Sequence, residues 1–130
     1  MSRIALAWML SVAAVAAQMP QWARAAPPSE RAAVANPTAG KAAMDLARFH
    51  YGNRDYAQAA RLFHQAYGLD PVPESLFNAA RAEQRAFELD DAERDFRAFL
   101  ALDAISDESR KRAQVHVTEV QETRARLESE

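Results

Sequence analysis

The sequence contains an internal repeat with a period of about 33 residues, and this repetition restricts the possible folds most strongly. One apolar pattern occurs twice: Ala59-x3-Phe63-x2-Ala66 is followed by Ala92-x3-Phe96-x2-Phe99. The segment before each copy repeats at the same spacing, as Ala43-x2-Leu46-Ala47 and then Leu76-x2-Ala79-Ala80. A period that carries two such segments predicts stacked helix–turn–helix units, none of which can bury its apolar face alone.

The apolar spacing predicts five helices, over about 38–51, 56–67, 73–87, 90–102 and 107–127. Leu46 and Leu127 are expected on packed faces, and His50 is expected in the core. Gly68 is expected to end the second helix in a left-handed conformation. No apolar run alternates with a period of two, so strands are not supported. The fold class is therefore predicted to be all-α.

The N-terminal segment, 1–25, has the three-part pattern of a secretory signal peptide. Arg3 precedes the apolar run 4–17, and the segment ends in Ala23-Arg24-Ala25, with small residues where the peptidase requires them. The run is shorter than the roughly 20 apolar residues that span a membrane. Cleavage after Ala25 is therefore favoured over an uncleaved membrane anchor.

The next segment, 26–38, is predicted to be a flexible linker because it contains three prolines and no repeating apolar face. The chain has no cysteine, which excludes disulfides and a lipid-modified N-terminal cysteine. Together with the signal peptide, this predicts a periplasmic or secreted protein with no stable membrane anchor after cleavage.

The repeated segment resembles the tetratricopeptide repeat (TPR) family, whose pattern is W-x2-L-G-x2-Y…A-x3-F…P over about 34 residues. In the first repeat Leu46-Ala47 stands at the L-G pair, and Tyr67 to Pro71 (YGLDP) is close to the usual helix exit. The second repeat keeps its small residues at Ala79-Ala80 and its Ala92 and Phe96. It replaces the Tyr, the last Ala and the Pro of the pattern by Glu83, Phe99 and Ala104.

The resemblance implies an α-solenoid of helical hairpins within residues 39–128. Repeat 1 would cover about 40–72, repeat 2 about 73–104, and a polar capping helix about 107–128. Roughly three repeats are usually needed for stability, so a homodimer or a larger partner is one way to complete the fold.

In the TPR family the first helix of each repeat lines a concave groove. The partner-binding positions carried over to this chain are Arg48, Tyr51, Phe77, Asn78, Arg81, Gln84 and Arg85. Asn78 matches an Asn that holds a peptide backbone in family members, and an amide both donates and accepts hydrogen bonds. The arginines suit carboxylates. The competing interpretation is that they are solvated charges and that Tyr51 and Phe77 are packing residues.

No pattern in the chain supports catalysis, a cofactor or a metal site. The motifs G-x-S-x-G, P-loop and G-x-G-x-x-G are absent, and His50, His64 and His116 fall on separate predicted helices. The acids near the fourth helix, Glu88, Asp90, Asp91, Glu93 and Asp95, are interpreted as solvated charges that complement the helix dipole. Residues 26–130 carry 14 basic and 18 acidic side chains, a net charge of -4 that argues against nucleic acid and anionic lipid.

The function expected from these features is that of a non-enzymatic adaptor of the bacterial cell envelope. It would bind an extended peptide or protein segment in the concave groove, and an acidic segment would suit the arginines. The alternative is a structural or oligomerisation subunit with no open groove. A solvent-open concavity around Arg48, Asn78 and Arg81 would favour the adaptor, whereas coverage of Phe77 by another chain would favour the alternative.

Overall fold

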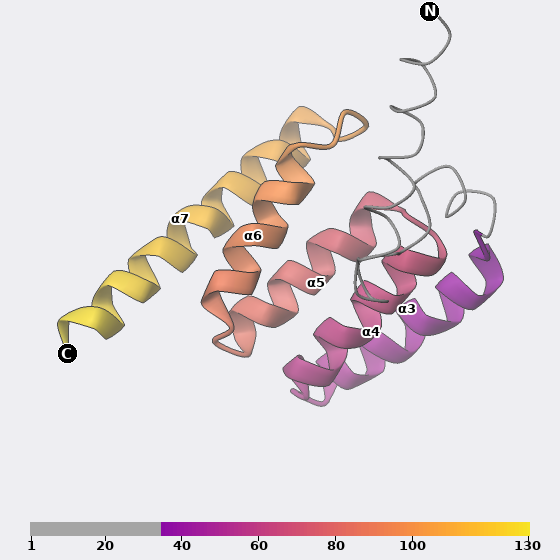
Figure 1. Ribbon diagram of the computed structural model, residues 1–130, viewed down its shortest axis with the longest axis horizontal. Coiled ribbons are helices and arrows are strands. Elements are labelled where there is room, and N and C mark those ends of the chain that lie inside the picture. Colours follow the sequence, from indigo (N-terminus) through magenta and orange to yellow (C-terminus); the bar gives the residue numbers. More distant parts are fainter. Residues whose placement is uncertain (1–34) are drawn as a thin grey trace, which may run out of the picture. The chain divides into compact units, whose positions relative to one another are not determined.

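A computed structural model describes residues 35–130, which form five helices and contain no strand (Figure 1). The helices are α3 (Pro37–Gly52), α4 (Tyr56–Leu69), α5 (Pro73–Arg85), α6 (Leu89–Leu100) and α7 (Asp107–Ser129). Each helix packs against the next one along the chain. The prediction of an all-α helical-repeat fold is therefore confirmed. The predicted signal peptide and the linker up to residue 34 lie outside the described residues.

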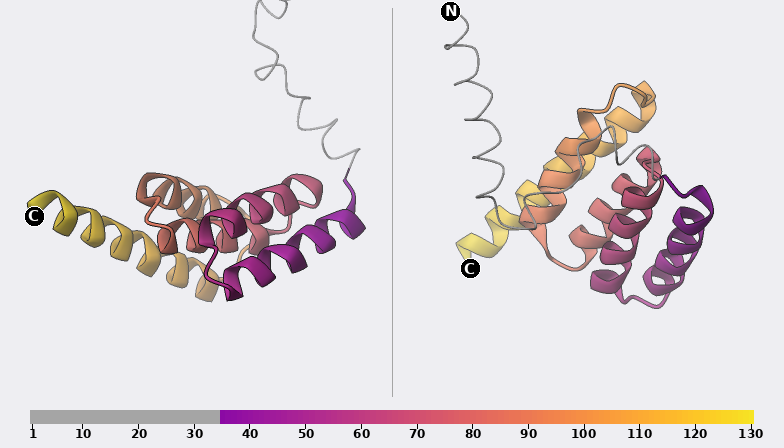
Figure 2. Two further views of the ribbon diagram at one scale, coloured as in Figure 1. Left: turned by 90° about the horizontal axis from the view of Figure 1, so that it is seen from below. Right: turned by 45° about the vertical axis from the view of Figure 1, so that its right-hand side comes forward.

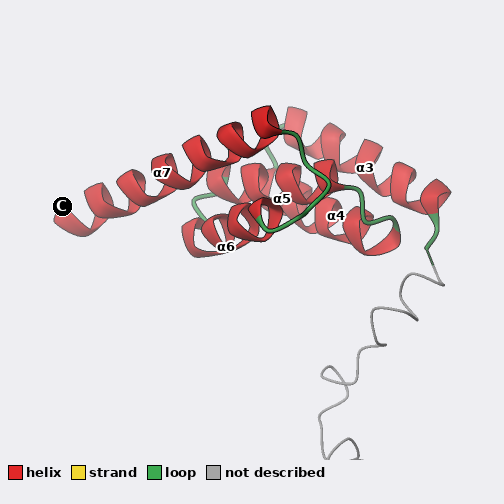
Figure 3. Ribbon diagram, turned by 90° about the horizontal axis from the view of Figure 1, so that it is seen from above, coloured by secondary structure: helices red, strands yellow, loops and turns green. Residues whose placement is uncertain are grey.

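The helices are arranged in a stack with α5 at its centre. α4 and α6 lie on one side of the stack, and α3 and α7 lie on the other (Figures 2 and 3). α5 contacts α4, α6 and α7. Among the described helices, none combines the length and the apolar character that crossing a membrane requires.

The backbone repeats at the same spacing as the sequence. Arg54 and Phe87, which are one repeat period apart, have φ angles of 64° and 60° and stand at equivalent points of the two hairpin turns. The next residues donate equivalent hydrogen bonds, from the Asp55 N–H to the His50 carbonyl at 3.0 Å and from the Glu88 N–H to the Glu83 carbonyl at 2.9 Å. The two hairpins therefore share one turn geometry, although neither left-handed residue is a glycine.

Two apolar clusters form the core, one for each repeat. Phe63 and its neighbours on α3 and α4 pack with Ala79 and Ala82 of α5. Phe77, Phe96 and Phe99 form the centre of the second cluster, which α7 completes with Ala113 and Val120. Phe63 and Phe96 are 2% and 0% exposed. α7 thus covers the apolar face of the second repeat, as predicted for a capping helix.

Two leucines expected on packed faces are exposed. Leu46 is 48% exposed, whereas its equivalent in the second repeat, Ala79, is fully buried against the first repeat. No helix pair precedes α3 in residues 35–130, so nothing there covers Leu46. Leu127 is also exposed, because it lies where the C-terminal end of α7 extends past α6 (Figure 1). The prediction that both leucines pack was wrong.

His50 and Gly68 also differ from the expectations. His50 is only half-buried, and its Nδ1 lies 3.1 Å from Asp55 Oδ2 instead of in the core. Gly68 lies inside α4 and does not have a positive φ. The helix ends after Leu69, at Asp70, whose backbone is extended. The cause is Pro71, because a proline disfavours helical geometry in the residue before it.

The helix bounds differ from the predicted ones by one or two residues at several ends. α3 begins at Pro37, inside the predicted linker, where the Asn36 side chain accepts a hydrogen bond from the Ala39 N–H at 3.0 Å. A proline suits this first position because its missing N–H has no helical partner there. α5 and α6 end at Arg85 and Leu100, two residues before the predicted ends.

The surroundings of Gly68 and Gly40 predict opposite effects on the free energy of unfolding when each is replaced by alanine. Gly68→Ala should raise the free energy of unfolding by about 0.5–1 kcal/mol, because alanine is the better helix former and its Cβ would meet nothing within 4 Å. Gly40→Ala should lower it, because the new Cβ would lie 2.7 Å from the Asp70 Cβ. Urea denaturation followed by circular dichroism measures both. Destabilisation by Gly68→Ala would indicate a left-handed helix cap instead.

Candidate functional site

A hollow of about 320 Å³ lies between α3 and α5. Its walls contain four of the seven residues predicted to bind a partner: Arg48, Tyr51, Asn78 and Arg81. Gly52, Glu74 and Phe63, the last from α4, complete it. The structure therefore brings together side chains from the first helices of both repeats.

A second hollow of about 320 Å³ lies on the other side of α5, towards α7. Phe77, Phe99, Ile105 and Arg112 are among the residues that line it. Glu74 and Asn78 line both hollows, so the two are neighbours that meet at α5. We call the two hollows together the α5 groove.

The polar side chains of the α5 groove differ in whether they already have partners. Arg48 donates to Glu74 Oε1 at 2.9 Å and to Asp45 Oδ1 at 3.3 Å. Asn78 and Arg81 are half-buried, and their side chains make no hydrogen bond or ion pair within residues 35–130. A partly buried polar group without a partner is costly. The Asn78 amide and the Arg81 guanidinium are therefore the groups best placed to bind a ligand.

The other three predicted residues have different surroundings. Phe77 is 7% exposed and packs edge-on against Phe96, so it is mainly a core residue, although it also lines the second hollow. Gln84 donates to Glu119 at 3.1 Å. Arg85 donates to the Tyr56 hydroxyl at 3.2 Å and lies over its ring. Neither Gln84 nor Arg85 lines the α5 groove.

Several residues that line the α5 groove are missing from the sequence-based prediction, among them Arg112 and Ile105, because it gives α7 only the role of a polar cap. Arg112 of α7 lies with its guanidinium 5.3 Å from the centre of the Phe77 ring, and Ile105 precedes α7. The available signal is the position of α7, which begins about one repeat period after α5. It therefore stands where the first helix of a further repeat would begin.

Burial and the positive charges of Arg81 and Arg112 lower the pKa of His116, on α7. Its ring stacks on Phe96, with the centroids 5.1 Å apart and the planes 6° from parallel. Burial is the main reason that its pKa is lowered, and the nearby charges of Arg81 and Arg112 lower it further, against the effect of Glu119. Arg81 and Arg112 therefore act on the same small region.

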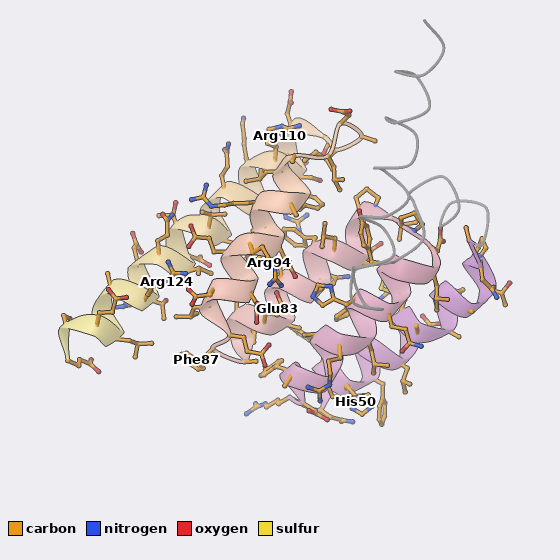
Figure 4. The ribbon with its side chains drawn as sticks, in the orientation of Figure 1. His50, Glu83, Phe87, Arg94, Arg110 and Arg124 are labelled. Atoms are coloured by element: carbon orange, nitrogen blue, oxygen red, sulfur yellow. The ribbon has the colours of Figure 1, made fainter. Side chains whose placement is uncertain are left out.

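A separate buried cluster joins His64 of α4, Glu83 of α5 and Asp95 of α6. His64 Nε2 lies 2.8 Å from Glu83 Oε1 and 2.8 Å from Asp95 Oδ2. The two acidic side chains are only 5% and 7% exposed. Arg94, which projects from α6 near Glu83 (Figure 4), lies with its Nε 3.0 Å from Asp95 Oδ1. Asp95 is thus buried, and its interpretation as a solvated charge was wrong.

The protonation of this cluster follows from its burial and its charges. The adjacent carboxylates, Asp95 first and Glu83 second, raise the pKa of His64 to about 9. Burial raises the pKa of Glu83. Burial also acts to raise the pKa of Asp95, but His64 and Arg94 outweigh it and hold that pKa at about 2. Without a ligand, the cluster therefore holds a charged imidazole beside an ionised Asp95.

Neither protein-family models nor curated proteins nor solved structures match this chain. The α5 groove and the buried cluster are therefore the features of this chain from which a function can be inferred.

α7 is held against α6 by ion pairs centred on Glu93. Its carboxylate accepts hydrogen bonds from Arg97 at 2.8 Å, from Gln121 at 3.0 Å and from Arg124 at 2.8 Å. Arg124, labelled in Figure 4, also lies 2.9 Å from Asp90 Oδ1. The bonds to Arg97, Gln121 and Arg124 lower the pKa of Glu93 to about 2. Because α7 carries Arg112, these contacts also fix one wall of the α5 groove.

The lowered pKa of Glu93 predicts how stability depends on pH. A carboxyl with a folded-state pKa of about 2 and an unfolded-state pKa of about 4.3 stabilises the fold fully above about pH 5. This contribution is lost as the pH falls through the folded-state value. Glu93→Gln should therefore be less stable than the natural protein at pH 6, and the difference should shrink towards pH 2. Urea denaturation across this range measures it, and a pH-independent difference would contradict the role of Glu93.

Proposed function

We propose that this protein is a peptide-binding adaptor that holds an extended, acidic segment of a partner protein in the α5 groove. The observation that carries the proposal is the meeting of Asn78 and Arg81 in one hollow, both half-buried and neither with a side-chain partner among residues 35–130. Such groups gain most from an external ligand, because their desolvation is already partly complete.

An extended peptide suits the composition of the α5 groove. Its backbone presents alternating donors and acceptors, and the Asn78 amide can satisfy one of each. Apolar surface from Phe63 and Tyr51 on one side, and from Phe99 and Ile105 on the other, suits side chains that flank the bound backbone. Asn78 lines both hollows, so a chain crossing α5 would reach both of them.

We expect the groove to prefer an acidic segment because some of its arginines have no carboxylate partner within residues 35–130. Asp45 and Glu74 partner Arg48. Within the described part of the chain no carboxylate pairs with Arg81 or Arg112, so the local charge is positive, although residues 26–130 carry a net charge of -4. Guanidinium groups bind carboxylates in two-point geometry. Asp or Glu in the ligand would supply the missing partners.

The location and family of this adaptor are part of the same proposal. Export to the periplasm or out of the cell is supported by the tripartite pattern of residues 1–25. Membership in the TPR family is supported by the internal sequence repeat and by the hairpin turns that repeat with it. In that setting the protein would act as a scaffold for an envelope complex.

Peptide selection on the purified protein tests the groove directly. We expect enrichment of sequences rich in Asp and Glu, with binding that weakens as salt increases. Arg81→Glu should weaken the selected peptides at least about tenfold, because it turns a favourable charge contact into a repulsive one, and Asn78→Ala should weaken them as well. Fluorescence anisotropy with labelled peptides measures both affinities.

Arg61→Glu is the matched control for this experiment. It makes the same change of charge at an exposed position of α4, where the guanidinium contacts only Gln58 among the described residues, away from the α5 groove. Its affinity should equal that of the natural protein. If both groove variants bind as tightly as the control, the proposed site is excluded.

The exposed face of α3 favours a second candidate function, that of an oligomerisation subunit. Leu46 and Phe49 are 48% and 64% exposed, whereas their equivalents Ala79 and Ala82 are fully buried against the preceding repeat. A second copy of this chain could cover that face and extend the stack. Phe49→Glu should then convert a dimer to a monomer in sedimentation equilibrium, whereas Val115→Glu on exposed α7 surface should not. A natural protein that is monomeric at all concentrations excludes this candidate.

A further inference from the structure

The cluster of His64, Glu83 and Asp95 brings three metal-ligating side chains from three helices to one point. One ligand atom from each residue lies within 4.8 Å of the other two. None of the three residues lines the α5 groove. We propose that they form a binding site for a divalent transition-metal ion, best suited to zinc(II), that is separate from the peptide groove.

The first support is an unpartnered oxygen inside the cluster. Glu83 Oε2 is buried and accepts no hydrogen bond within residues 35–130, and the side chain that carries it is 5% exposed. His64 Nε2 lies 2.8 Å from both Glu83 Oε1 and Asp95 Oδ2, so the two carboxylates share one imidazole. Buried carboxylate oxygens are normally hydrogen-bonded or bound to a metal.

The second support comes from comparing the two repeats. Asp95 stands one repeat period after Leu62, which is 8% exposed and packs in the first core cluster. The fold therefore accepts an apolar side chain at this position and does not require an acid there. Removing an ionised carboxylate from water is unfavourable unless other groups compensate its charge. The second repeat bears this cost for both Glu83 and Asp95, which points to a ligand for them.

The ligand set and its charge fit zinc(II). Imidazole nitrogen and carboxylate oxygen both bind this ion, at about 2.0–2.2 Å. In a tetrahedral site such ligand atoms lie about 3.3 Å apart. The two separations from His64 Nε2 are 2.8 Å and would have to widen, and the two carboxylate oxygens, which lie within 4.8 Å of each other, would have to adjust to the same distance. A dication with a neutral imidazole would also balance the two carboxylates.

The residues around the cluster would orient one of the metal ligands and leave another partly exposed to solvent. Arg94 Nε lies 3.0 Å from Asp95 Oδ1, so it can hold this outer oxygen while Oδ2 binds the ion. Hydrogen bonds of this kind orient metal ligands and are worth about 10–100-fold in affinity. The His64 side chain is 38% exposed. The exposed part of this side chain is where the ion would enter, and water would be its fourth ligand.

Calorimetric titration of the tag-free, chelator-treated full chain with zinc(II) tests the site. We expect one ion per chain, and cobalt(II) should give visible absorption bands of a low-coordinate complex. His64→Ala should weaken zinc(II) binding at least about a hundredfold. His50→Ala is the matched control, because it removes an imidazole that lies beside Asp55, outside the cluster. Equal affinity of the His64 variant and the natural protein would overturn the proposal.

Asp95→Leu separates loss of the metal from loss of the fold. It introduces the residue that the first repeat has at this position. Circular dichroism checks that the variant folds, because removing one member of a buried ion pair destabilises a protein. Zinc(II) should raise the melting temperature of the natural protein and leave this variant unchanged. If zinc(II) neither binds nor stabilises the natural protein, the cluster is a buried ion network only and the proposal fails. Peptide binding by the α5 groove is measured independently, without zinc(II).

Discussion

The structure depends on the packing of α5 between the two core clusters. One side of this helix places Ala79 and Ala82 in the first cluster, and the other places Leu76, Phe77 and Ala80 in the second. All three alanines are fully buried, and their small side chains let the neighbouring helices approach closely. A larger residue there would push the helix pairs apart. The two repeats are therefore joined by contact of their helices and not only by the chain between them.

Because α5 is shared, it also positions both candidate sites. Asn78 and Arg81 point into the groove between α3 and α7, whereas Glu83 lies against His64 of α4 and Asp95 of α6. A helix turns about 100° per residue, so residues a few positions apart can face opposite sides. One helix thus separates a partly open polar groove from a buried ionic cluster, and the two share no residue.

The helices and the repeat could be predicted from the sequence because apolar spacing is a local property. Burial could not be predicted as well, because it depends on what lies beyond the helix. Leu46 and Ala79 occupy equivalent positions, but within residues 35–130 only Ala79 has a preceding repeat to pack against. In the sequence Asp95 looks like the solvated acids around it. Its partner His64 lies on α4, two helices earlier in the chain, so local spacing does not reveal the pair. Arg112 was missed for a related reason, since a capping helix was not expected to help line a groove.

Because each position in one repeat has an equivalent in the other, comparing the two shows whether packing alone explains a buried residue. Where both copies are apolar, as at Phe63 and Phe96, packing accounts for the residue. Where a buried apolar residue is matched by a buried acid, as at Leu62 and Asp95, packing alone does not. The first copy shows that the backbone accepts leucine, so the carboxylate must be explained by its other neighbours. Those neighbours are an imidazole and a second carboxylate, a combination that suits a metal ion better than it suits an apolar core.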